Sequence, residues 1–397
     1  MKKIVFLGPL YPVEQESEIQ KNIIVSVSNA PNVFQWNLIQ GMHKLIDSRL
    51  SIVNVLPVGT WKKQYKKFFL NDVEWESNGI LGHEIGTINV PFLKQWQRTV
   101  KTHKYLKTVI DENTEIILYS AYMPFLKAIY NFPPKVKVTA IITDIPQYYD
   151  LASVSLYRKI LRAIQNRMIK HFLKRVDRFI VLTKQMCEPL EVGKRPWICI
   201  EGICDLNQSE NMKKIMDTQI IFYSGTLHYQ YGIKNLLEAF SLIRNDNIEL
   251  WICGRGEASI EIDLLAQKDK RVKFYGFCTQ SEVRELRNKA TILVNPRCNE
   301  GEYVKYSFPS KTMEYMASGK PVVMYKLDGI PDEYDKYLNY VVPIGDHATQ
   351  LALTLQEVMY KYDEAMDKAE KARKFVFENK NSIRQAQRIL EFIKFDE

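Results

Sequence analysis

Residues 308–323 read Phe-Pro-Ser-Lys-Thr-Met-Glu-Tyr-Met-Ala-Ser-Gly-Lys-Pro-Val-Val, which predicts a loop, a helix and a strand in that order. Ser310 is a candidate helix cap, Gly319 can end the helix in a left-handed turn, and Pro321 stops the helix before the strand. The start of such a helix offers free backbone N–H groups and the positive end of its dipole. The segment therefore predicts an anion-binding site.

Two charged residues of this predicted helix suit a nucleoside diphosphate. Lys311 lies in the first turn and adds a full positive charge to the anion site. Glu314 lies about one turn further along, where a carboxylate can accept hydrogen bonds from two ribose hydroxyls. Taken alone, the segment also fits an ordinary surface helix.

Short β-rich apolar runs alternate with longer helical patterns through most of the chain, which is typical of βαβ units and parallel sheets. The runs form two series, so we expect an α/β protein with two Rossmann-like domains. The first series is Lys3–Leu7, Leu50–Val55, Ile116–Tyr119, Val136–Ile142, Arg178–Leu182 and Trp197–Ile200. The second series is Gln219–Tyr223, Glu249–Cys253, Val272–Tyr275, Ile292–Val294, Val322–Tyr325 and Tyr340–Val342.

The chain length also predicts two domains, because 397 residues exceed one ordinary core. The polar stretch 202–216 separates the two series of strands. The predicted domains are 1–205 and 206–378, followed by a helix over 379–397 that can pack back on the first domain. Ligands of doubly wound sheets bind beyond the carboxyl ends of the strands, so we expect the site in those loops, at a cleft between the domains.

Composition limits the partners. The six cysteines are scattered without metal-ligand spacing, which favours a reducing compartment and no structural metal. The net charge of +9 implies an acidic partner, such as nucleic acid, an anionic membrane or a phosphorylated small molecule. No run approaches the ~18 apolar residues of a membrane span.

The most basic segment is 156–178, where apolar residues recur at roughly helical spacing. A basic amphipathic helix of this kind can lie on an anionic leaflet. The alternative is a surface helix packed on its own domain, with the basic side chains extended toward water.

The segment from Phe308 to Val323 resembles the donor-site signature of glycosyltransferase family four. The resemblance extends to 223–227, 231–233, 253–256 and 272–277, and so covers most of the C-terminal half. It implies the GT-B fold, in which two Rossmann-like domains face each other across a cleft. It also implies transfer of a sugar from a nucleotide-sugar donor with retention of anomeric configuration.

The resemblance implies a set of site residues. Beside them, we expect Lys311 and Arg297 to stabilise the leaving diphosphate, because both flank the loop predicted to face the cleft. Asp144 follows a strand on the acceptor side, and its alternative role is a helix or turn cap. The expected donor-binding residues are Gly225, Thr226, Arg255, Phe277, Tyr306, Ser307, Phe308, Pro309, Ser310, Lys311 and Glu314. Without the neighbouring motifs, the Gly254-Arg255-Gly256 turn would suit any α/β protein.

The chain departs from the family pattern at two places. Tyr306 stands where the family has a first glutamate, although Glu300 and Glu302 lie nearby in sequence. An arginine and a lysine common in the family are replaced by Thr226 and Tyr231. The cations that remain available for phosphate binding are Lys311, Arg297, Lys305 and Arg255. The sequence has no Asp-x-Asp motif, so we expect no metal and no cofactor, with the nucleotide-sugar as a substrate.

These inferences predict a cytoplasmic glycosyltransferase that uses a UDP-sugar and acts on a saccharide or lipid-linked saccharide. The expected pathway is surface polysaccharide biosynthesis, of capsule or exopolysaccharide, at the inner face of the cell membrane. One alternative is a nucleotide-sugar epimerase of the same fold. Another is a nucleic-acid-binding protein, which only the charge suggests, because no recognised RNA or DNA motif is present. We therefore expect no nucleic-acid partner.

Overall fold

The computed structural model describes residues 2–25, 29–145, 156–204, 218–342 and 345–395, without the side chains of 156–159. The chain divides into two compact units. Unit 1 comprises Met1–Ile203 and Ser382–Glu397, and unit 2 comprises Cys204–Asn381. The predicted boundaries, after 205 and after 378, lie close to these divisions. Most of the predicted polar linker falls outside the described residues.

Unit 1 is built on a sheet with the order β10-β9-β8-β7-β1-β2-β5-β4. All neighbouring strands are parallel except β4, which pairs antiparallel with β5. A separate antiparallel pair joins β3 and β6. The strands are β1 (Lys3–Pro9), β2 (Leu50–Val55), β3 (Phe69–Leu70), β4 (Val73–Ser77), β5 (Ile80–Glu84), β6 (Thr87–Ile88), β7 (Thr114–Tyr119), β8 (Lys137–Ile142), β9 (Arg178–Val181) and β10 (Trp197–Cys199).

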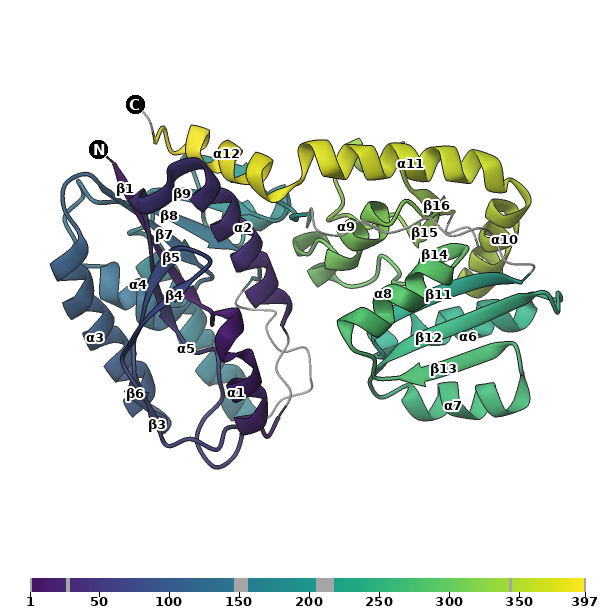
Figure 1. Ribbon diagram of the computed structural model, residues 1–397, viewed down its shortest axis with the longest axis horizontal. Coiled ribbons are helices and arrows are strands. Elements are labelled where there is room, and N and C mark those ends of the chain that lie inside the picture. Colours follow the sequence, from purple (N-terminus) through teal and green to yellow (C-terminus); the bar gives the residue numbers. More distant parts are fainter. Residues whose placement is uncertain (1, 26–28, 146–155, 205–217, 343–344, 396–397) are drawn as a thin grey trace. The chain divides into compact units, whose positions relative to one another are not determined.

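Helices cover both faces of this sheet (Figure 1). On one face, α3 (Leu93–Val109) packs beside α4 (Met123–Ile129), which in turn contacts α5 (Leu156–Leu173). On the other, α2 (Ala30–Ile46) packs against α12 (Ser382–Phe392), and α1 (Glu16–Asn22) follows β1. Ala386, Ile389 and Leu390 of α12 belong to the core of unit 1. The C-terminal helix is therefore part of this unit.

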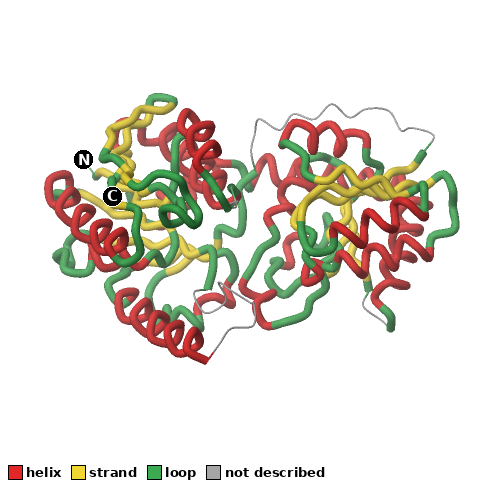
Figure 2. Tube along the Cα trace, turned by 90° about the horizontal axis from the view of Figure 1, so that it is seen from below, coloured by secondary structure: helices red, strands yellow, loops and turns green. Residues whose placement is uncertain are grey.

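Unit 2 contains a fully parallel sheet with the order β13-β12-β11-β14-β15-β16. Helices lie on both of its faces, as Figure 2 shows from a second direction. The strands are β11 (Gln219–Thr226), β12 (Ile248–Arg255), β13 (Val272–Gly276), β14 (Ile292–Asn295), β15 (Val322–Tyr325) and β16 (Asn339–Val341). The helices are α6 (Ile233–Leu242), α7 (Ser259–Lys268), α8 (Gln280–Lys289), α9 (Ser310–Ala317), α10 (His347–Tyr360) and α11 (Tyr362–Asn379).

Each predicted strand is present at its predicted place, and the helix predicted over 379–397 is α12. The β4–β5 hairpin was not predicted. Its two-residue turn is Asn78-Gly79, with φ of 52° and 76°, and such a pair between apolar runs is a strong hairpin signal. Among the described residues, no helix has both the length and the apolar character needed to span a membrane.

Candidate functional site

The start of α9 is the first part of the candidate site. Pro309 is the N-cap residue and makes no side-chain capping bond, while Ser310 is already the first helical residue. The predicted cap at Ser310 is therefore wrong, because the proline places the helix start one residue earlier in the motif. The end of the helix is as predicted, with Gly319 at a φ of 70° and β15 beginning after Pro321.

Lys311 connects the start of α9 to the carboxyl end of β11. Its ammonium group donates a hydrogen bond to the carbonyl oxygen of Ser224 and lies 5.6 Å from the centroid of the Tyr223 ring. A Cβ atom on Gly225 would lie 2.2 Å from Lys311 Nζ. Burial lowers the pKa of Lys311, while nearby Glu314 opposes that shift. The structure thus brings together Gly225 and Lys311, two predicted site residues that are far apart in the sequence.

Arg297 follows β14 and is buried between two aromatic rings. Its guanidinium carbon lies 5.6 Å from the ring centroid of Tyr231 and 5.1 Å from that of Tyr303. Burial lowers the pKa of Arg297, and the two tyrosines partly offset this effect. Within the described ranges its Nε atom has no hydrogen-bond partner. Arg297 therefore keeps one buried N–H group without a partner among the described residues.

The Tyr223 side chain interacts with both Arg297 and Lys311. Burial raises the pKa of its hydroxyl, and the positive charge of Arg297 acts in the opposite direction. The same ring lies beside the Lys311 ammonium. The hydroxyl donates to the carbonyl oxygen of Thr226 at 3.0 Å. Two positive side chains thus act near the carboxyl end of β11.

Glu314 is held by a residue that the sequence did not point to. Its Oε2 atom lies 3.7 Å from a terminal nitrogen of Arg287 on α8. The side chain of Arg287 is 5% exposed, whereas that of Glu314 is 42% exposed. The buried cation fixes the carboxylate, which remains open to a ligand on its other side. Nothing in the pattern of α8 indicates that Arg287 is buried.

The other predicted donor-binding residues lie in two places. Arg255 is the last residue of β12 and Phe277 follows β13. Both are exposed, and the guanidinium carbon lies 4.2 Å from the centroid of the Phe277 ring. Near α9, the ring of Phe308 is buried and lies 5.4 Å from that of Tyr334, so only its backbone can reach a ligand.

The residues before Phe308 make contacts within their own turn. Lys305 Nζ lies 5.1 Å from the centroid of the half-buried Tyr306 ring. The Ser307 hydroxyl donates to the carbonyl oxygen of Val304 at 3.3 Å.

The two nearby glutamates pair with other residues. Glu300 Oε1 lies 3.5 Å from His347 Nε2, and Glu302 Oε1 lies 3.4 Å from Lys305 Nζ. Each carboxylate is therefore already next to a basic side chain. Tyr306 occupies the position of the missing family glutamate in the 3-10 turn Glu302–Tyr306.

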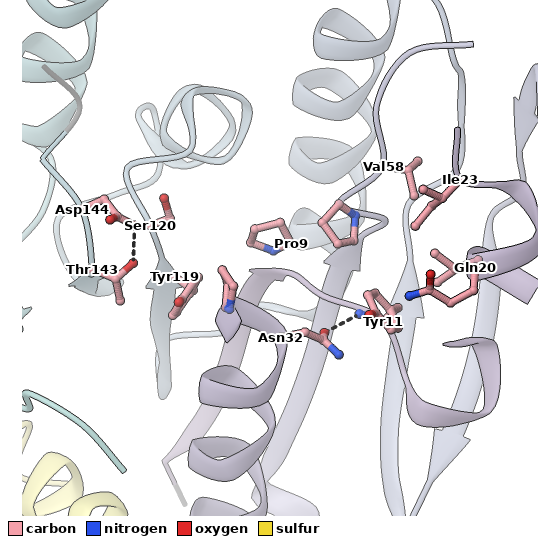
Figure 3. A pocket seen from close by; sticks show the side chains of 13 residues that line it. Pro9, Tyr11, Gln20, Ile23, Asn32, Val58, Tyr119, Ser120, Thr143 and Asp144 are labelled. Carbon is pink, nitrogen blue, oxygen red and sulfur yellow. Dashed lines mark hydrogen bonds between the residues drawn. The ribbon is translucent and has the colours of Figure 1, made fainter. Parts of the chain in front are cut away.

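Unit 1 contains a cavity of about 220 Å³ at the carboxyl ends of β1, β2, β7 and β8 (Figure 3). Its lining residues include Pro9, Tyr11, Asn32, Val58 and Asp144. This is the place where doubly wound sheets bind ligands. The cavity therefore supplies a second candidate binding site, separate from the residues of unit 2.

Asp144 lies at one side of this cavity, next to Thr143 (Figure 3). The Thr143 hydroxyl donates to Asp144 Oδ2 at 3.2 Å. The surrounding protein raises the pKa of the Asp144 carboxyl by removing water, and the bond from Thr143 reduces that rise. The predicted catalytic carboxylate thus lines the cavity of unit 1. Pro146, which follows it, lies outside the described residues.

Tyr11 and Asn32 form the opposite side of the cavity. The backbone N–H of Tyr11 donates to Asn32 Oδ1 at 3.0 Å, and its hydroxyl donates to Asn29 Oδ1 at 2.9 Å. Trp36 Nε1 donates to the Tyr11 carbonyl oxygen at 2.7 Å. These bonds fix the loop after β1 to the start of α2. The sequence analysis did not select Tyr11.

Part of the chain matches the sequence pattern of a known protein family. Residues 218–360 match the family model described as glycosyl transferases group 1. The match lies entirely within unit 2. The matched residues include Gly225, Arg297 and Lys311. No curated protein matches the sequence.

Solved glycosyltransferase structures resemble the whole chain. Sucrose-phosphate synthase from Thermosynechococcus elongatus has a TM-score of 0.70 at 15% identity, over 99% of this chain and 98% of that one. The lipopolysaccharide outer core galactosyltransferase WaaB has a TM-score of 0.63 at 12% identity, over 100% of both chains. The Anabaena protein HepE, solved with UDP, has a TM-score of 0.62 at 14% identity, over 99% of both. The predicted GT-B fold is confirmed.

The wall of the unit 1 cavity is held by two buried basic residues of α3, Lys94 and Arg98. Lys94 Nζ donates to the carbonyl oxygens of Val58 and Gly59, at 2.6 and 3.2 Å. Arg98 donates to the carbonyl oxygen of Leu56 at 2.6 Å. Because Val58 lines the cavity, both side chains fix the loop that shapes it.

We expect Lys94→Met to remove a pH dependence of stability between about pH 7 and 10. Burial, and to a smaller extent Arg98, lowers the pKa of Lys94 to about 7. Above that pH the unfolded chain binds a proton that the folded chain lacks, so the free energy of unfolding rises with pH by up to about 1.4 kcal/mol per unit. Thermal unfolding of wild type and Lys94→Met at several pH values measures this slope.

The matched control is Lys101→Met on the same helix, because Lys101 is partly exposed and pairs with Asp72 at 2.6 Å. This control should keep the wild-type slope. Parallel curves for wild type and Lys94→Met between pH 7 and 10 would contradict the prediction.

Proposed function

We propose that the protein transfers a sugar, with retention of configuration, from a UDP-sugar bound by unit 2 to a saccharide or lipid-linked saccharide bound by unit 1. The main observation behind the proposal is that the ammonium group of Lys311 lies next to the glycine turn at Gly225. This arrangement places an ammonium group, a helix N-terminus and side-chain-free backbone at one point, which suits a diphosphate.

The proposed chemistry is departure of the nucleoside diphosphate and attack by an acceptor hydroxyl, whose proton passes to the leaving diphosphate. As the bond between the anomeric carbon and the phosphate oxygen breaks, negative charge grows on the diphosphate. Lys311, Arg297 and the N–H groups of α9 stabilise that charge. Glu314 holds the ribose, and the exposed Arg255–Phe277 pair offers a flat surface to the base. Asp144 orients the acceptor hydroxyl in the cavity of unit 1.

We expect UDP to bind without a metal ion, since cationic side chains are available and the sequence has no Asp-x-Asp motif. UDP at 100 times its dissociation constant should stabilise the protein by about 2.7 kcal/mol, equally with and without a chelator. A thermal-shift titration measures this. Loss of the shift on adding the chelator would show that a metal is required.

Sugar transfer and epimerisation are separated by omitting the acceptor. The cavity of unit 1 favours transfer, because a second substrate needs a second site. Incubation with the nucleotide-sugar alone should leave the sugar configuration unchanged. Isomerised free donor would overturn the proposal in favour of an epimerase.

We further propose that the acceptor is met in the cytoplasm at the inner face of the membrane, in surface polysaccharide biosynthesis. Helix α5 supports this, because Ile160, Ile164 and Met168 are exposed although Ile169 and Leu173 are buried. The helix contains no acidic residue. An anionic membrane, rather than nucleic acid, is therefore the proposed acidic partner.

A further inference from the structure

Helix α3 buries two of its charged residues and exposes two large apolar ones, although Leu106 is buried and Lys104 and Lys107 are exposed. Lys94, Arg98 and Thr102 face the protein, whereas Trp96 and Val100 are 61% and 46% exposed. A surface helix of a soluble domain normally has the opposite arrangement. The inward face is explained by the loop carbonyls that Lys94 and Arg98 bind. Among the described residues of unit 1, none offers such an explanation for the exposure of Trp96 and Val100.

Phe92, directly before α3, is a second anomaly. It is 90% exposed and has a φ of 62°. A bulky residue in this left-handed region is strained, and such strain is often retained for function. The ring gains no compensating burial in the described structure. Its position extends the exposed row of Trp96 and Val100 by one helical turn.

A lysine-rich aromatic segment lies beside the start of α3. Residues 61–69 read Trp-Lys-Lys-Gln-Tyr-Lys-Lys-Phe-Phe, and Trp61 and Phe69 are 40% and 63% exposed. The backbone N–H of Trp61 donates to Asn89 O at 2.8 Å, and that of Asn89 donates to Phe68 O at 2.7 Å. Figure 1 shows β3 and β6 next to the lower end of α3. The two apolar groups therefore share one region of unit 1.

We propose that this region docks on an anionic lipid bilayer, with Phe92, Trp96, Trp61 and Phe69 entering the headgroup boundary. Neither 61–69 nor α3 contains an acidic residue, and both carry several lysines. Aromatic rings suit the membrane interface, and lysines suit anionic headgroups. Lys67 and Lys101 pair with Glu18 and Asp72, but Lys62, Lys63, Lys104 and Lys107 are exposed, so the surface keeps a positive charge that suits anionic headgroups.

The proposed membrane surface is directly linked to the unit 1 cavity. Gly59, bound by Lys94, lies two residues before Trp61, and Val58 lines the cavity. A lipid-linked molecule in the bilayer would therefore find the cavity next to the docking surface. The membrane proposal concerns a site outside α5 and does not rest on sugar transfer, so lipid binding tests it alone.

The test is co-sedimentation of the full chain with vesicles of phosphatidylcholine, alone or mixed with phosphatidylglycerol. We expect binding to the mixed vesicles that weakens as salt increases. The double variant Phe92→Ser/Trp96→Ser should bind them at least about tenfold more weakly. Tyr360→Ser in unit 2 is the matched control, because Tyr360 is also 90% exposed, and it should bind as the wild type does.

Two further variants make the outcome decisive. Trp96→Phe keeps an apolar ring, so it should bind normally but lose part of the fluorescence quenching by brominated lipids. Ile164→Ser tests whether vesicle binding depends on α5 rather than on the region of α3. Equal binding by wild type and the Phe92→Ser/Trp96→Ser variant, loss with Ile164→Ser alone, or binding to neither vesicle type would overturn the proposal.

Discussion

Lys311→Ala is expected to lower the turnover number about 100- to 1000-fold, with a much smaller change in the KM for the donor. In the proposed mechanism the ammonium group lies where the diphosphate gains charge as it leaves, so it would stabilise the transition state more than the ground state. Burial lowers the pKa of Lys311 in the free protein, and a bound diphosphate would favour its charged form. Steady-state kinetics with a fixed acceptor and varied donor measure both parameters.

Glu314→Ala provides the contrasting variant. The carboxylate, fixed by Arg287, is assigned to the ribose, which does not change during the reaction. Its removal should mainly raise the KM for the donor. Lys268→Ala, an exposed lysine at the end of α7, should change neither parameter. If Lys311→Ala keeps near-normal turnover, Arg297, Lys305 or Arg255 must stabilise the leaving diphosphate instead.

The strands and the main elements of the donor site could be predicted because their signals are local. Apolar runs predicted the strands of both sheets, and the glycine at position 319 and proline at position 321 predicted the end of α9. The meeting of Gly225 with Lys311 follows from the sheet order, which places β11 next to β14. Once that order is known, the loops after β11 and before α9 must converge.

The remaining features depend on burial that no local pattern reveals. Arg287 is an ordinary basic residue near a helix end until the fold buries it under Glu314. Helix α3 would mislead any periodicity argument, because Lys94 and Arg98 occupy the inward positions and Trp96 an outward one. In both cases the buried charge is compensated by a partner distant in sequence. Only tertiary structure identifies that partner.

Gly225→Ala is expected to reduce turnover nearly as much as Lys311→Ala, although the protein still folds. The added Cβ would lie 2.2 Å from Lys311 Nζ and 2.4 Å from Cε. The end of a flexible lysine can move away at little cost, but it then leaves the position next to Ser224. The φ of 153° at this residue also disfavours alanine and should lower the free energy of unfolding by about 1–3 kcal/mol.

A double-mutant cycle separates the displaced lysine from the strained backbone. If Gly225→Ala acts through Lys311, adding it to Lys311→Ala should cause little further loss of turnover, because the affected group is already absent. Gly193→Ala in unit 1 is the matched control, since its φ is 61° and the nearest atom to the new Cβ, Glu191 O, is 4.0 Å away. It should lower stability and leave turnover near the wild-type value. If the two losses of turnover are fully additive in the double variant, Gly225→Ala does not act through Lys311. The glycine would then be needed because its backbone, without a side chain, lets the diphosphate approach closely.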